Sequence, residues 1–329
     1  IAGQGVSKED VSGADAADRT VSSEPCVLVR GADAHPGLFV GFLGQTEHLG
    51  NLAVSTDDDM RFKSLEAVCE FDGVPLAPGA RRSTHWLVFC TFENEHEMLG
   101  RFAEWLARMY EIPPPGPAPS IYCSWYFYGR EMSEKDLHEN LDALREHPVP
   151  FDVLLIDDCW SDYFGSWNAN EKWPGGMADA AARIRAAGYE PGIWTCPFVV
   201  MAESPVLRDY PGIVARNAAG EPCRFAYQGP ECYVVDVTSP DAERYFNDFY
   251  RRLRDWGFRY HKMDFLRAVV ADPAICFHRS DLTRAQAYRL GMQRVRDALG
   301  QDAYILACGG LFEGSIGLAD GLRTGTDTK

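Results

Sequence analysis

The chain has 329 residues with 32 Lys or Arg against 48 Asp or Glu, so its formal net charge is −16. Its 46% hydrophobic and 24% charged residues are typical of a globular protein, and its length is typical of two domains. The acidic excess argues against nucleic acid or an anionic membrane as a partner, because Lys and Arg lead phosphate binding. No apolar run reaches the ~18 residues of a membrane span.

Ten cysteines are scattered along the chain without a C-x-x-C pair. A zinc ribbon or a thioredoxin-type site therefore lacks support, and reduced thiols in the cytoplasm are expected. The sequence opens at Ile1 without a Met, so we expect the natural N-terminus to lie upstream.

The first third of the chain has strand-like apolar runs separated by Gly and Pro, at residues 38–43, 61–71 and 85–92. This pattern is typical of an all-β module. An amphipathic helix follows, with its apolar face formed by Met98, Phe102, Trp105, Leu106 and Met109. We therefore predict a partial β-domain over residues 1–112 and a proline-rich linker over 113–120.

From residue 121 onward, strand-like and helix-like segments alternate. Six strands are predicted, at residues 121–128, 151–156, 189–198, 258–265, 303–308 and 321–324. Helix starts between them are marked by Ser133, Ser239-Pro240 and Thr283. This order predicts an α/β fold with a parallel sheet. We favour a (β/α)8-type barrel over 121–329 that stops after about six strands. An open doubly wound sheet is the alternative, but the first strand is not followed by a glycine-rich fingerprint.

Catalytic groups of such a barrel lie at the carboxyl ends of its strands. The candidates there are Trp125, Tyr126, Asp157, Asp158, Trp194, Lys262, Asp264, Cys308, Arg323 and Asp327. Aromatic faces cover the C–H patches of a sugar, and charged groups bind its hydroxyls, so the set favours a carbohydrate site.

Lys262 and Asp264 are two residues apart on a strand, so both should point to one side. A neighbouring Lys would lower the pKa of Asp264, which suits a nucleophile, although a structural ion pair is equally compatible with the spacing. Asp327, on another strand, would face Asp264 across a small cavity, as glycosidic cleavage requires.

The remaining candidates are also compatible with structural roles. Asp157 and Asp158 suit a turn, Trp125 and Trp194 core packing, Cys308 a buried thiol, and Arg323 a salt bridge. Four strand-end Asp could hold magnesium. However, Lys262 and Arg323 bring positive charge there, and His261 should point away, so no metal is predicted.

Six segments then run in the order of a known family: Ser124-Trp125-Tyr126, Ile156-Asp157-Asp158-Cys159-Trp160, Pro191 to Phe198, Tyr260 to Phe265, Ile305 to Gly309, and Asp320 to Thr328. Over about 121–329 the chain thereby resembles glycoside hydrolase family 36, the α-galactosidases, of the clan shared with family 27. The resemblance implies an N-terminal β-supersandwich, here partial. It also implies that the last two barrel strands and a C-terminal β-domain are missing.

The resemblance further implies a retaining double displacement that hydrolyses terminal α-linked galactose. Asp264 matches the nucleophile, and Asp327 matches the general acid/base, about 5–5.5 Å away. Asp157 and Asp158 match the pair that binds the galactose hydroxyls at C4 and C6. Other sugar contacts are matched by Lys262, Arg323, Cys308, Trp194 and Tyr126. Galactoside oligosaccharides are the implied substrates, with no cofactor, and a homo-oligomer is compatible with the family.

Four alternatives stay open. One is an α-galactosyl transferase of the same family. Another is an α-N-acetylgalactosaminidase, since Gly309 and Gly310 leave room near the sugar C2. The third is a non-catalytic galactoside-binding remnant, and the fourth is a metal-dependent barrel enzyme.

Overall fold

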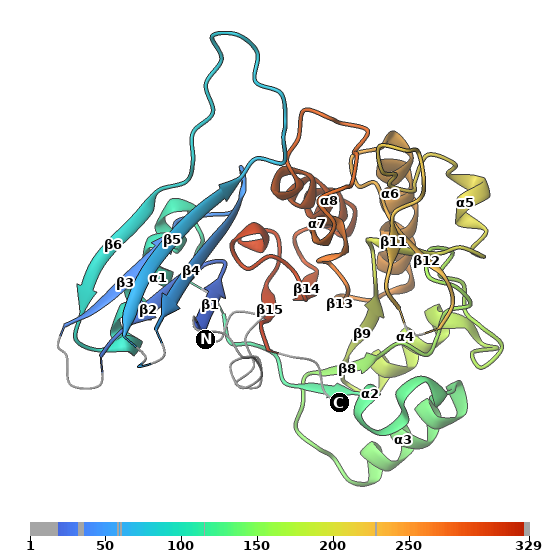
Figure 1. The fold of residues 1–329 in the computed structure, drawn as a ribbon. Helices are drawn as coiled ribbons and strands as arrows, with labels where there is room; N and C mark the ends of the chain where they lie inside the picture. The colour runs from blue at the N-terminus through green and yellow to red at the C-terminus, as the bar shows by residue number, and fades with distance from the viewer. Residues whose placement is uncertain are drawn as a thin grey trace.

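The computed structural model describes residues 19–31, 36–57, 59, 61–114, 116–227 and 229–325. A β-rich N-terminal part lies beside a larger α/β part (Figure 1). Within the described ranges, no helix is both long enough and apolar enough to cross a membrane.

The N-terminal part consists of two antiparallel three-stranded sheets. One has the order β1 (Arg19–Ser23), β4 (Leu49–Thr56), β5 (Phe62–Glu70), and the other β2 (Cys26–Val29), β3 (Gly37–Phe42), β6 (Leu87–Phe92). Because successive strand side chains alternate, β3 is buried on both sides. Val40 and Phe42 pack in a cluster with Leu52, and Phe39 packs in another with helix α1 (Glu95–Met109).

The α/β part is built on six parallel strands in the order β15-β14-β13-β9-β8-β7. In chain order they are β7 (Ile121–Cys123), β8 (Val153–Ile156), β9 (Glu190–Thr195), β13 (Tyr260–Met263), β14 (Tyr304–Cys308) and β15 (Gly321–Arg323). Neighbours in the sheet are also neighbours among these strands along the chain, as in a (β/α)8 barrel. The predicted fold class, a barrel-type α/β sheet of six strands preceded by antiparallel sheets, is confirmed.

Helices connect these strands, and several begin at the predicted caps. The long helices are α3 (Glu134–Glu146), α4 (Gly176–Ala186), α6 (Pro240–Trp256) and α8 (Arg284–Leu299). Ser133 and Thr283 form capping boxes for α3 and α8, and Ser239 caps α6 with Pro240 in its first turn. Gly257, with φ 101°, ends α6 in the left-handed conformation that glycine adopts readily.

Shorter elements fill the connections. They are α2 (Trp125–Tyr128), the 3-10 turns η1 (Gly129–Glu131) and η2 (Glu313–Ser315), α5 (Val206–Asp209) and α7 (Ala268–Ala271). A small antiparallel sheet of β10 (Val199–Met201), β12 (Cys232–Val234) and β11 (Arg224–Phe225) lies between β9 and α6 along the chain.

The predicted first strand is shorter than expected. It ends at Cys123 instead of Tyr128, because Ser124 takes a helical backbone conformation with φ −64° and ψ −24°. Two hydrogen bonds fix this turn: the Ser124 N–H donates to the Leu155 carbonyl over 3.1 Å, and the Asp157 N–H donates to Ser124 Oγ over 2.9 Å. Tertiary contacts therefore override the high strand propensity of the aromatic run.

Ion pairs join the two parts of the molecule. Arg284 at the start of α8 binds Glu70 at 2.6 Å and Asp72 at 2.7 Å, and also donates to the Val270 carbonyl. Arg267 binds Glu24 at 2.5 Å.

Candidate active site

Asp157 and Lys262 form a buried ion pair at the strand ends. Lys262 Nζ lies 2.8 Å from Asp157 Oδ2, and the two side chains are 12% and 2% exposed. Cys123 Sγ also donates to Asp157 Oδ2, over 3.3 Å. Burial opposes the charge of Lys262, but the attraction and hydrogen bond of Asp157 outweigh it and raise the pKa of Lys262.

Asp264 lies directly after β13 and accepts three hydrogen bonds. Its Oδ1 accepts from the Phe265 N–H at 3.0 Å and from Arg323 Nη2 at 3.3 Å, and its Oδ2 accepts from Trp194 Nε1 at 3.4 Å. Phe265 has φ 56°, an uncommon left-handed conformation for a residue other than glycine. Such local strain is common at functional sites.

Opposing effects act on the pKa of Asp264. Burial raises the pKa of Asp264, and the Arg323 guanidinium, the Phe265 N–H and Lys262 only partly offset this effect. Lys262 lowers the pKa of Asp264 as expected, but the effect of burial is larger, so the pKa is raised overall. The direct partner of Lys262 is Asp157, and the closest cation to the Asp264 carboxylate is Arg323.

Asp158 points away from Asp157 toward loop residues. Its Oδ2 accepts from Arg130 Nε at 3.0 Å and from the Tyr227 hydroxyl at 3.5 Å, while the Arg130 guanidinium lies 5.2 Å from the Tyr227 ring centroid. Burial raises the pKa of Asp158, and Arg130 counteracts it. These residues line a cavity of about 160 Å³ together with Lys172.

Arg130 and Tyr227 were not predicted. Arg130 follows α2 at the strand-end edge, so its position alone could have drawn attention. Tyr227 belongs to the insertion between β9 and α6, where no local pattern marks it.

Two predicted residues combine core and site positions. Trp194 packs against Phe164, Trp167 and Phe265 while donating to Asp264. Cys308 is fully buried, and burial together with the charge of Asp264 raises its pKa to about 12.

The remaining candidates lie just after β7 or outside the described ranges. Trp125 and Tyr126 are in α2, and Tyr126 is 74% exposed. Across the described part of the chain, no hydrogen bond or ring contact joins Tyr126 to Asp157 or Asp264. Asp327 lies outside the described residues, so its pairing with Asp264 stays a prediction.

Four Asp at the strand ends are a possible set of metal ligands in the sequence. His261 is buried with its ring 6.4 Å from that of Tyr250 in α6, so it faces the helices as predicted. Of the described residues, the His-carboxylate group with metal-like spacing comprises Glu134, His138 and Asp179, on α3 and α4.

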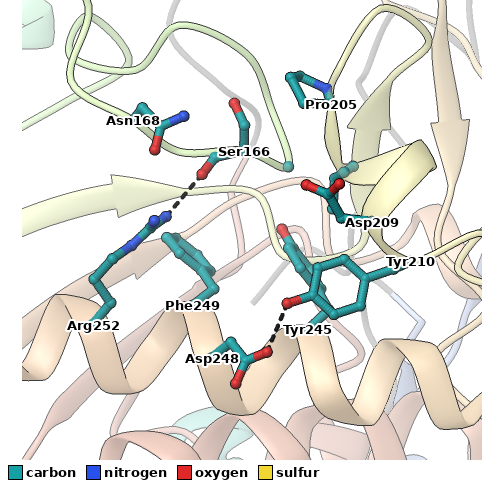
Figure 2. Close-up of a pocket in the computed structure, with 11 residues that line it drawn as sticks. Ser166, Asn168, Pro205, Asp209, Tyr210, Tyr245, Asp248, Phe249 and Arg252 are labelled. Atoms are coloured by element: carbon teal, nitrogen blue, oxygen red, sulfur yellow. Dashed lines mark hydrogen bonds between the residues drawn. The ribbon is translucent and has the colours of Figure 1, made fainter.

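A second cavity, of about 200 Å³, lies beside α5 and α6 (Figure 2). Figure 2 shows Tyr210 donating to Asp248, over 2.6 Å, and Arg252 donating to the Ser166 carbonyl, over 2.8 Å. None of its lining residues is a predicted site residue.

Comparison of the sequence with known families identifies the family of the chain. The sequence profile of the melibiase family matches residues 118–311, and the chain belongs to that family. It is thus a member of a glycoside hydrolase family, and the resemblance to the family 27 and 36 clan is confirmed.

Individual relatives are more distant. The myogenesis-regulating glycosidase of Mus musculus is 29% identical over 140 residues, which are 41% of this chain and 19% of that protein. Alpha-xylosidase XylQ of Lactiplantibacillus pentosus is 22% identical over 205 residues, 58% of this chain and 25% of that protein. TtGalA, an α-galactosidase from Thermus thermophilus solved with stachyose, superposes with a TM-score of 0.72 at 28% identity. That match covers 93% of this chain and 59% of TtGalA.

Proposed function

We propose that the protein is a retaining α-galactosidase in which Asp264 is the nucleophile and Asp327 the general acid/base. The observation that carries the proposal is the environment of Asp264: a buried carboxylate at the end of a barrel strand, oriented by Arg323 and Trp194. The likeness to TtGalA, solved with stachyose and with p-nitrophenyl α-D-galactopyranoside, supports galactosides as the substrate class.

The reaction follows from two carboxyl groups on opposite sides of the bond. An Asp264 oxygen forms a bond to the anomeric carbon while the glycosidic bond breaks, and Asp327 gives its proton to the leaving oxygen. Asp327 then takes a proton from water, whose oxygen attacks the same carbon and displaces Asp264. Two inversions return the α-configuration.

The other strand-end groups would bind the sugar. Asp157 and Asp158 would accept hydrogen bonds from the hydroxyls at C4 and C6, and they are oriented for this by Lys262 and Arg130. Trp194, Cys308, Trp125 and Tyr126 would complete the contacts to the ring.

One feature favours a second candidate, an α-N-acetylgalactosaminidase. Gly309 follows Cys308 with φ 66°, and a Cβ added there would meet no atom within 4 Å. This space beside Cys308 would accept a larger group at C2. The expectation does not hold for Gly310, because a Cβ there would collide with the Tyr288 hydroxyl.

The test uses aryl α-glycosides with one leaving group and four sugars: galactose, N-acetylgalactosamine, xylose and glucose. We expect the galactoside to be cleaved fastest, and NMR should show α-galactose as the first product. Asp264→Gly should abolish cleavage. Added azide should restore release of the aryl alcohol, because it enters the vacated space and bonds to the anomeric carbon to give β-galactosyl azide.

The matched control is Asp142→Gly on the exposed face of α3, which should leave turnover unchanged. Release of β-galactose first would contradict the retaining mechanism. Galactose binding without aryl alcohol release by the unaltered protein would favour the non-catalytic alternative, and faster transfer to an added sugar than to water would favour the transferase. Loss of cleavage on chelation would favour the metal-dependent alternative.

A further inference from the structure

A cluster of potential ligands lies on the helical layer, apart from the strand ends. Glu134 and His138 are four residues apart on α3, so they share one helix face. Asp179 comes from the first turn of α4. One oxygen of each carboxylate and one ring nitrogen of His138 lie within 4.8 Å of one another.

Each member of the cluster has an atom that makes no hydrogen bond among the described residues and could bind a metal ion. Glu134 Oε2 accepts from the Gly175 N–H at 2.7 Å, and Asp179 Oδ2 accepts from Arg183 Nε at 2.5 Å. The second oxygen of each carboxylate takes part in no hydrogen bond among the described residues. His138 Nε2 is shut off from solvent, and it has no hydrogen-bond partner within the described ranges. A buried polar atom without a partner is costly, so it indicates a ligand.

We propose that Glu134, His138 and Asp179 form a Zn²⁺ site that links α3 to α4. An imidazole with two carboxylates suits zinc, whereas calcium and magnesium prefer oxygen ligands alone. Zinc bonds to nitrogen and oxygen are about 2.0–2.2 Å long, and the three ligand atoms already lie within 4.8 Å of one another. Water would complete a tetrahedron around the ion.

The charges around the cluster bear on affinity. Arg183 shares Asp179, and its positive charge opposes a second cation, so we expect moderate affinity. The Lys135–Glu139 pair lies on the exposed side of α3.

The position of the cluster suggests what the ion would hold in place. The Glu134 N–H donates to the Lys172 carbonyl at 3.0 Å, and Lys172 Nζ donates to the Arg130 carbonyl. Arg130 in turn binds Asp158. Zinc would therefore fix the loop before α4 that supports Arg130 behind the candidate active site, as a structural ion rather than a reacting one.

The experiment measures zinc directly on the full chain, without substrate. Protein stripped with EDTA is dialysed against ZnCl₂, and bound zinc is compared among the unaltered protein, His138→Gln, Asp179→Asn and His147→Gln. His147 lies at the end of the same helix and serves as the control. We expect the two cluster variants to bind one equivalent less than the unaltered protein and His147→Gln, or to bind it at least about tenfold more weakly.

Melting temperatures separate binding from folding. In EDTA, His138→Gln and the unaltered protein should melt alike, and zinc should raise the melting temperature of the unaltered protein alone. Zinc held by the ten cysteines would persist in every variant. Equal zinc binding in all four proteins, or none in the unaltered protein, would overturn the proposal whether or not galactosides are cleaved.

Discussion

Lys262 in β13 reaches past β9 to bind Asp157 at the end of β8, at 2.8 Å, instead of its own neighbour Asp264. In a barrel, side chains from alternate strands share one interior layer, and β8 and β13 are alternate strands. The layer therefore determines the partner of Lys262, and the pair is held out of water.

Breaking this pair should be costly. Lys262→Met leaves the Asp157 carboxylate buried and unpaired, so the free energy of unfolding should fall by about 3–5 kcal/mol. The double variant Lys262→Met/Asp157→Asn should be more stable than Lys262→Met alone, because it removes the orphaned charge. Urea denaturation measures both values.

The control for this pair is Lys135→Met, which removes an exposed ion pair with Glu139 at 3.4 Å. Its effect should stay within about 0.5 kcal/mol. A Lys262→Met effect of the same small size would show that the buried pair contributes no more than a surface one.

Arg323 should determine the pH at which the acid limb of the kcat/KM profile falls. The nucleophile reacts as a carboxylate, so kcat/KM should fall as the pH drops through the pKa of Asp264. Burial raises that pKa and the Arg323 charge lowers it, so Arg323→Gln should move the acid limb to higher pH. The pH dependence of aryl α-galactoside cleavage measures the shift.

Arg323→Lys keeps the charge and should leave the acid limb closer to that of the unaltered protein. An acid limb that stays in place in Arg323→Gln would mean that a group other than Asp264 controls it.

Glu313 should make stability depend on pH. Its side chain is fully buried where η2 meets the N-terminal part, and Oε2 accepts from the Gly44 N–H at 3.0 Å. Burial raises the pKa of Glu313 well above its usual value. A carboxyl whose pKa is raised on folding stabilises the fold at low pH, and this stability is lost as the pH rises through the folded-state pKa.

Glu313→Gln removes this titration while keeping an acceptor for Gly44. The variant should therefore lose less stability than the unaltered protein as the pH rises, with a gain of about 1 kcal/mol at the alkaline end. Urea denaturation over a pH series measures the difference, and parallel curves for the two proteins would contradict the assignment.

The capping residues offer a matched comparison. Ser133→Ala removes the cap of α3 and should lower the free energy of unfolding by about 1 kcal/mol. Thr283→Ala removes the cap of α8 and also the 2.8 Å hydrogen bond that Thr283 Oγ1 donates to the Glu47 carbonyl in the N-terminal part. Thr283→Ala should therefore lower the free energy of unfolding by about 1 kcal/mol more than Ser133→Ala does. Equal losses in thermal denaturation would show that the Glu47 contact adds nothing.

Local signals in the sequence predicted much of the fold. Ser133, Ser239 and Thr283 mark helix starts through hydrogen bonds to residues three positions away, so sequence spacing reveals them. Strand order followed from the strict alternation of strands and helices. The early end of β7 was missed, because Ser124 is held by Leu155 and Asp157, far along the chain.

The candidate site was predicted less completely than the fold. Residues at strand ends could be chosen from the pattern, but the partner of Lys262 depends on barrel layering and not on spacing within one strand. Arg130 and Tyr227 reach Asp158 from loops, and loop conformation has no periodic signal in the sequence.

The contacts of Arg284 bear on how the molecule denatures. One guanidinium binds Glu70 and Asp72 of the N-terminal part and the Val270 carbonyl next to α7, and it is nearly buried. If the antiparallel sheets separated from the barrel part, the Arg284 guanidinium would lose its carboxylate partners while still poorly hydrated. Heat should consequently melt the antiparallel sheets and the barrel strands in a single cooperative transition, seen as one calorimetric peak.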